Sequence, residues 1–147
     1  MATQVAKQVA PLGSSDVVTA AVVSGCERIA FLGRLFGGFK YTVEARVYAT
    51  FEDLSPRAPR GVWQFVQLSN GGGYLRPVVD KCRLSTRTQW FAPVSADVAG
   101  VVTTIAALEV LRKQYSAEGI FGMRLSQLRD FARTHQEGAV IAYLLMA

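Results

Sequence analysis

The order of helical and strand-like patterns along the chain is the feature that most constrains its fold. Apolar residues recur at helical spacing before residue 37 and after residue 95, whereas the segments between them resemble β-strands. A protein with a parallel α/β sheet would alternate the two patterns along its length. We therefore expect an α+β fold with an N-terminal helix, a four-stranded antiparallel meander sheet, and C-terminal helices packed on that sheet.

Four segments in the middle of the chain predict the strands. Residues 42–51 alternate apolar and polar side chains, which is typical of a strand buried on one face. Residues 62–69 and 73–79 are rich in β-branched and aromatic side chains and lie on either side of a glycine run. Residues 82–91 predict a weaker fourth strand. The short links between consecutive strands favour antiparallel neighbours.

Helical patterns bound these strands on both sides. A helix is expected from residue 15 or 16 to Phe36, with a break favoured at Ser24 and Gly25 and an end at the glycines that follow. Ser95 is a favourable N-cap for a helix over residues 96–115, and Asp97 would lie in its first turn. Further helical spacing covers residues 121–131 and 140–145.

Length and composition indicate one globular domain. A chain of 147 residues can bury a core without disulfides or metals. Residues 1–14 show no sustained periodicity and are expected to form a flexible arm, which leaves residues 15–147 as the domain. No segment approaches the roughly 20 apolar residues that a membrane span needs. Cys26 and Cys82 match no disulfide or metal framework, which indicates reduced thiols and a cytoplasmic setting.

The glycine run at residues 71–73 could hold a ligand or turn the chain. A phosphate-binding loop would continue into Lys-Ser/Thr and a helix, but here the chain continues into the strand-like segment YLRPVV. Asn70 and the glycines supply the positive φ angles that tight turns use. The run therefore predicts a hairpin turn.

The positive charge is concentrated in one segment. The net charge is +5, and residues 57–90 contain six basic residues and one acid, which accounts for the whole excess. The basic residues are Arg57, Arg60, Arg76, Lys81, Arg83 and Arg87. They are mixed with aromatic residues such as Trp63 and Trp90, a composition that single-stranded nucleic-acid binders use for stacking and phosphate contacts. Aromatic residues in strands are more often core, so this segment supports nucleic-acid binding only as an alternative.

The inventory of reactive residues does not favour an enzyme. His135 is the only histidine, and its position near a helix end is explained by an interaction with the helix dipole. No motif places a nucleophile beside a base, and no spacing of Cys, His and acidic residues suggests a metal site. We expect no catalytic residues, no metal and no cofactor.

Four segments in collinear order carry a family resemblance. They are CERIAFLGRLFG (26–37), GVWQFVQLSNGGGY (61–74), VSADVAGVVTTIAAL (94–108) and LRDFARTHQEGAVI (128–141). Together they resemble the antirestriction proteins of the ArdB/KlcA type, over about residues 20 to 142. The C-terminal YLLMA stands where an acidic tail is common in that family.

The resemblance implies a small α+β protein of plasmids and other mobile elements that relieves type I restriction of incoming DNA. Such a protein is an inhibitor without a cofactor, and its partner would be the host type I restriction-modification complex or a factor controlling it. The net charge of +5 is opposite to the negative field that a DNA mimic needs. We therefore expect inhibition through surface contacts, at the polar rim of the sheet and the adjoining helix ends. The candidate partner-binding residues are Asn70, Tyr74, Arg76, Asp97, Arg129 and Asp130.

Overall fold

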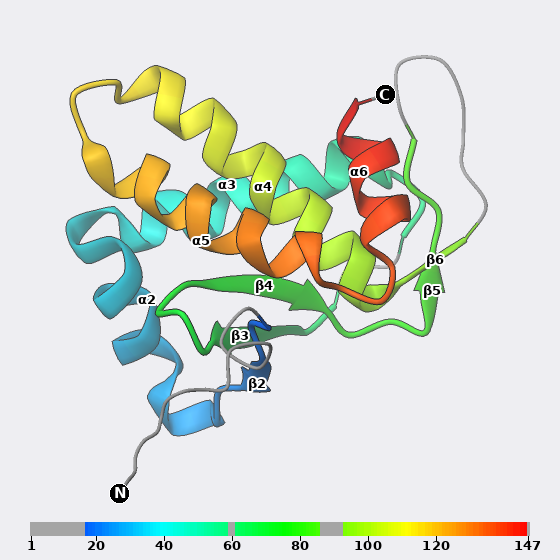
Figure 1. The fold of residues 1–147 in the computed structure, drawn as a ribbon, viewed down its shortest axis with the longest axis horizontal. Helices are drawn as coiled ribbons and strands as arrows, with labels where there is room; N and C mark the ends of the chain where they lie inside the picture. Colours follow the sequence, from blue (N-terminus) through cyan, green and yellow to red (C-terminus); the bar gives the residue numbers. More distant parts are fainter. Residues whose placement is uncertain (1–16, 59–60, 86–92, 147) are drawn as a thin grey trace, which may run out of the picture.

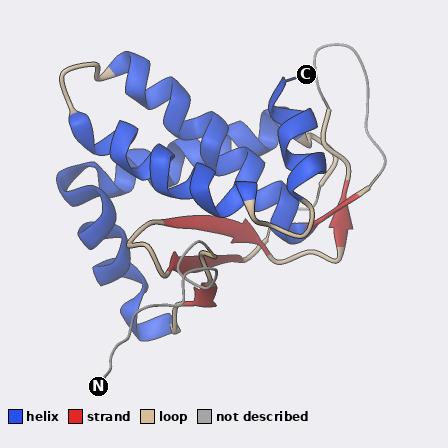
Figure 2. Cartoon of the chain, viewed as in Figure 1, coloured by secondary structure: helices blue, strands red, loops and turns tan. Residues whose placement is uncertain are grey.

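A computed structural model describes residues 17–58, 61–85 and 93–146 of the chain. The first half contains β2 (Ala20–Val22), α2 (Arg28–Phe36), α3 (Lys40–Leu54), β3 (Trp63–Leu68) and β4 (Gly73–Pro77). The second half contains β5 (Lys81–Cys82), β6 (Val94–Ser95), α4 (Ala96–Gln114), α5 (Gly119–Arg133) and α6 (Gly138–Met146). α4 and α5 lie over one side of strands β3 and β4, and α2 runs beside them (Figures 1 and 2). The fold is α+β, as predicted.

The strands form two small antiparallel sheets, not one four-stranded meander. The larger sheet has the order β2-β3-β4, with Val22 opposite Val66 and Phe65 opposite Leu75. The smaller sheet pairs β5 with β6. Of the predicted fourth strand, Cys82 belongs to β5, and residues 86–91 lie outside the described residues.

The segment predicted as the first strand, residues 42–51, is instead the helix α3. Its buried residues are Val43, Val47 and Phe51, which are spaced four apart and therefore fit one face of a helix as well as one face of a strand. Ala45 and Ala49 complete the alternation in the sequence, but both are exposed. Alanine is the strongest helix former, so counting it as apolar produced a false strand pattern.

The N-terminal helix is shorter than predicted. Residues 20–22 form the edge strand β2, which pairs with β3, and a 3-10 turn at Gly25–Glu27 separates it from α2. The β-branched residues before Ser24 favour a strand once an open sheet edge is available. The break at Ser24 and Gly25 and the end of α2 at Gly37, which has φ of 56°, agree with the prediction.

The core is built around α4, which contacts α3, α5, α6 and β4 (Figure 1). Gly100 allows the close contact with β4, because a Cβ atom there would lie 2.7 Å from the carbonyl oxygen of Leu75. Thr104 satisfies the backbone polar groups of Leu75 at the edge of β4. Its hydroxyl accepts from the Leu75 amide at 3.2 Å and donates to the Leu75 carbonyl at 3.3 Å. The outer edge of β4 is therefore paired at Leu75 by a helix.

The predicted glycine turn is present between β3 and β4. Gly71 has φ of 94°, a conformation that favours glycine. A Cβ atom on Gly73 would lie 2.5 Å from the ring of Phe31. The helices predicted over residues 96–115, 121–131 and 140–145 correspond to α4, α5 and α6.

Candidate functional site

A single carboxylate joins segments that are distant in the sequence. Asp97 accepts hydrogen bonds from the hydroxyl of Tyr74 and, at 2.8 Å, from Nη1 of Arg76, both at Oδ1. Its Oδ2 accepts from Nε2 of His135 at 2.5 Å. Oε1 of Gln64 accepts from Nε and Nη2 of Arg76 at 3.0 and 2.7 Å. We call these five residues the Asp97 cluster.

Local structure explains why these side chains meet. Tyr74 and Arg76 are two residues apart on β4 and so point to the same face of the sheet. Gln64 lies directly opposite Arg76 on β3. Asp97 is in the first turn of α4, whose predicted N-cap Ser95 accepts from the amide of Val98 at 3.2 Å.

His135 is held in one orientation in the loop after α5. Its Nδ1 accepts a hydrogen bond from the backbone amide of Glu137 at 2.9 Å and therefore carries no proton. The ring proton is on Nε2, which donates it to Asp97. The side chain is only 10% exposed and packs edge-to-face on Phe131 with ring centroids 5.3 Å apart. His135 does follow the end of α5, as expected, but its largely buried side chain is held by Asp97 and by the Glu137 amide and not by the helix dipole. Because both ring nitrogens are engaged, the imidazole is placed to hold Asp97 and not to accept a substrate proton.

The electrostatics of the cluster favour one fixed charge state. Partial burial opposes the charge on Asp97, but the hydrogen bonds from Tyr74, His135 and Arg76 outweigh it and hold the pKa of this carboxyl below its ordinary value. Burial, together with the hydrogen bond to Asp97, raises the pKa of the Tyr74 hydroxyl. Near neutral pH the carboxylate therefore stays ionised and the phenol stays protonated.

The cluster reaches the surface at a shallow depression. Gln64, Arg76, Ser95 and Asp97 line it, together with the segment that follows β4. The side chains of Arg76 and Asp97 are 24% and 25% exposed, whereas Tyr74 is buried. The exposed parts of Arg76 and Asp97 are therefore accessible to a partner. Tyr74 is not accessible, and its hydroxyl holds Asp97 from the interior.

The other three candidate residues lie outside the Asp97 cluster. The amide nitrogen of Asn70 donates to the carbonyl of Gln127 at 2.9 Å, and its oxygen accepts from the amide of Gly72 at 3.1 Å, which joins the hairpin turn to α5. Arg129 forms an ion pair with Glu109 of α4, and Asp130 forms one with Arg133 within α5.

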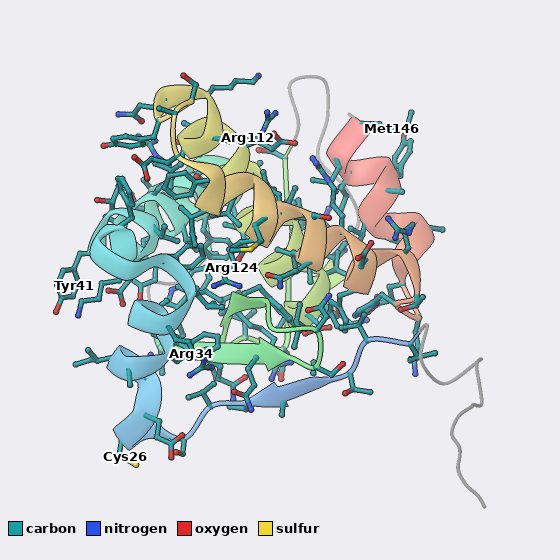
Figure 3. All side chains as sticks on the ribbon, turned by 60° about the vertical axis from the view of Figure 1, so that its left-hand side comes forward. Cys26, Arg34, Tyr41, Arg112, Arg124 and Met146 are labelled. Atoms are coloured by element: carbon teal, nitrogen blue, oxygen red, sulfur yellow. The ribbon has the colours of Figure 1, made fainter. Side chains whose placement is uncertain are left out.

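A residue absent from our candidates completes the attachment of this turn. Arg124 donates to the carbonyls of Leu35 and Gly71 at 2.8 and 3.2 Å, and Figure 3 labels it where α5 faces α2. Its targets are backbone carbonyls, so no sequence pattern marks this role. The roles of His135 and Gln64 also leave no signal in the sequence, because their partners are fixed only by the packing of whole elements.

The basic residues of segment 57–90 lie in different environments in the structure. Arg57, Lys81 and Arg83 are exposed, whereas Arg76 belongs to the Asp97 cluster. Arg60 and Arg87 lie outside the described residues.

The described residues offer no cluster of three or more His, Cys, Asp or Glu side chains that could hold a metal ion. Within the same ranges, no helix has the length and hydrophobicity needed to cross a membrane.

Comparison with known proteins shows the family to which this chain belongs. The family model described as antirestriction protein matches residues 57–145, and the chain belongs to this family. It is 36% identical over 110 residues to the putative antirestriction protein YubI of Escherichia coli K12, covering 74% of this chain and 78% of the relative. It is 33% identical over 130 residues to an antirestriction protein KlcA of Escherichia coli, covering 84% and 92%.

A solved structure has the same fold. It matches with a TM-score of 0.78 and 31% identity over 87% of this chain and 94% of the other. That structure is described as showing, for the KlcA and ArdB proteins, a novel fold and antirestriction activity against type I DNA restriction systems in vivo but not in vitro. The predicted family is confirmed.

Proposed function

We propose that this protein relieves type I restriction of incoming plasmid or phage DNA, as an inhibitor that acts through surface contacts in the cytoplasm. The family membership carries this proposal, together with the activity described for the structural relative. Activity in vivo but not in vitro, as described for that relative, favours a partner or condition present only in the cell. Of the two partners expected from the sequence, the host type I complex and a factor controlling it, this favours the controlling factor, or the complex in a state that it has only in the cell.

The geometry of the Asp97 cluster supports inhibition without catalysis. A general base needs a free lone pair directed at a substrate proton, but His135 uses Nδ1 for the Glu137 amide and Nε2 for Asp97. Tyr74 is buried beneath the ion pair. The cluster thus connects β3, β4, α4 and the loop after α5, and fixes the shape of the surface above it.

The net charge of the chain supports inhibition by contact with a partner and argues against inhibition by mimicry of DNA. A DNA mimic presents phosphate-like negative charges, and this chain carries a net charge of +5. We assign the contacts to the exposed edges of Arg76 and Asp97 and to Arg129 and Asp130 on α5. Asn70 and Tyr74 position the surface from within the fold.

The test is the plating efficiency of unmodified phage on a host with a type I restriction system, with a type II host as control. We expect relief confined to the type I host. Arg129→Ala combined with Asp130→Ala should abolish relief, because surface ion pairs contribute little to folding and their loss removes contacts only. Lys113→Ala, an exposed change at the end of α4, is the matched control and should keep full relief. Full relief by the double variant would remove both residues from the interface.

Nucleic-acid binding stays the alternative function. One observation favours it: the hydroxyl of Ser55 donates to the carbonyl of Arg83 at 2.7 Å, and this places the exposed Arg57 and Arg83 in neighbouring segments. Such a patch would bind DNA with an affinity that falls steeply as salt rises.

A further inference from the structure

A cavity with aromatic walls lies between α3 and the start of β3, apart from the Asp97 cluster. It has a volume of about 700 Å³. Tyr48 and Phe51 of α3 form one wall, and Trp63 of β3 forms another. The exposed Val62 and Val78, at 66% and 52%, lie at its rim. Apolar side chains left this exposed beside a cavity are suited to cover a bound chain.

The aromatic rings are arranged around Trp63. The ring of Phe51 stands edge-on to it at 88° with centroids 5.1 Å apart, and the ring of Tyr48 is tilted at 47° with centroids 5.2 Å apart. Trp63 and Tyr48 are only half-buried, so parts of both rings remain accessible from the cavity. Tryptophan and tyrosine are the rings that attract a cation most strongly.

The charges at one end of the cavity also favour a cation. Glu52 and Asp53 line it from the last turn of α3, where the helix dipole is negative. That turn contains no basic residue, although a cation is the charge that a helix C-terminus favours. The helix end therefore adds its negative potential to that of the Asp53 carboxylate.

Among the described residues that line the cavity, Arg28 is the basic one, and its guanidinium is directed elsewhere. Its Nη2 donates to the carbonyl of Trp63 at 2.8 Å, and its guanidinium carbon lies 4.3 Å from the centre of the Phe65 ring. Arg28 thus demonstrates, at the neighbouring ring of the same strand, that a guanidinium stacks well on this surface. Both contacts hold the guanidinium of Arg28 at Trp63 and Phe65, and no ion pair between Arg28 and Asp53 is found among the described residues.

We infer that this cavity binds an arginine side chain of a partner protein. The guanidinium would lie against the exposed parts of Trp63 and Tyr48 and face Asp53, while Val62 and Val78 would contact the partner's backbone or neighbouring residues. The inference goes beyond the proposed function, because the binding can be measured without any restriction system.

The experiment titrates the purified full chain with the peptide acetyl-Gly-Arg-Gly-amide. The readout is the indole N–H resonance of Trp63, which Trp90→Phe assigns because the chain has only two tryptophans. We expect a saturable shift of this resonance in the millimolar range. The same peptide with citrulline, a neutral isostere of arginine, should cause no shift.

Two variants test the assigned contacts. Asp53→Asn should weaken binding at least about twofold, the effect of losing one exposed charge pair. Glu118→Gln, which removes an exposed acid ahead of α5, is the matched control and should bind like the unchanged protein. An unmoved Trp63 resonance, equal binding of the citrulline peptide or of a lysine peptide, or unchanged affinity in Asp53→Asn would each overturn the inference.

Discussion

At the scale of single residues, Asp97 is the group on which the described site depends. One carboxylate accepts from a phenol, a guanidinium and an imidazole that the chain delivers from β4 and from the loop after α5. Such a network holds its members more firmly than separate pairs would, since each donor fixes the carboxylate for the others. Asp97 is thus a positioning residue for the surface that carries Arg76.

Replacement of Asp97 should therefore weaken the fold measurably. Asp97→Asn keeps the size of the side chain but removes the charge that Arg76 faces, and we expect a loss of about 1.5–3 kcal/mol in the free energy of unfolding, the range for hydrogen bonds to charged groups. Urea denaturation measures it. Asp130→Asn, which removes a more exposed carboxylate, should change the same quantity by less than about 0.5 kcal/mol. Equal effects of the two variants would contradict the central role of Asp97.

The pH dependence of stability provides an independent test at the same residue. Because the pKa of Asp97 is lowered in the folded protein, its stabilisation is complete above the unfolded carboxyl's pKa of about 3.9 and is lost as the pH falls through the folded value. Between about pH 5 and about pH 2 the unchanged protein should therefore lose more stability than Asp97→Asn. The pKa of Glu109 is also lowered, but this group is common to both proteins and cancels in the comparison. Parallel curves would show that Asp97 is not held in its charged form.

At the scale of elements, the contact between α4 and β4 brings the site together. α4 carries Asp97 and β4 carries Tyr74 and Arg76, so the spacing of these two elements decides whether the ion pair forms. Gly100 and Thr104 set that spacing, one by the absence of a side chain and the other by its hydrogen bonds to the strand edge.

Gly100→Ala should disturb both the fold and the site. The added Cβ atom would lie 2.7 Å from the Leu75 oxygen and 2.9 Å from Cα of Arg76, both backbone atoms that cannot rotate away. We expect a loss of about 1–3 kcal/mol in unfolding free energy, as for other overpacked core positions, and weaker restriction relief. Gly122→Ala in α5 is the matched control: its Cβ would meet nothing closer than 3.9 Å, and alanine favours helix by up to about 1 kcal/mol. If Gly100→Ala were as stable as Gly122→Ala, the close packing of α4 on β4 would not be required.

The same elements show which parts of the fold can be predicted from sequence patterns. α4, α5 and the hairpin of β3 and β4 follow from periodicity, a cap and turn glycines, which are local signals. The sequence pattern predicts a strand at α3 because Val43, Val47 and Phe51 fit the helical and the strand period equally, and only contacts with the rest of the core decide between them. Tyr74, Arg76 and Asp97 could be named as candidates from the sequence, but not His135. Its role depends on a loop that meets the start of α4 across 38 positions.

At the scale of the whole molecule, the protein combines a positive net charge with membership of the antirestriction family. The proposed mode of action is occupation of a partner, which is consistent with this charge and with the engagement of both ring nitrogens of His135. Inhibition of that kind is stoichiometric: each molecule blocks one target, so the effect grows with the number of copies. An enzyme would instead achieve full relief at a small fraction of the number of targets.

The measurement that tests this account most directly is the plating efficiency of unmodified phage on a type I host as the amount of this protein is raised stepwise. Quantitative immunoblotting gives the copies of this protein and of the restriction complex in each culture, and a type II host is the control. The account predicts graded relief that becomes complete only when the protein is at least as abundant as its target, with none in the type II host. Complete relief far below that abundance, or no relief at any level of folded protein, would contradict it.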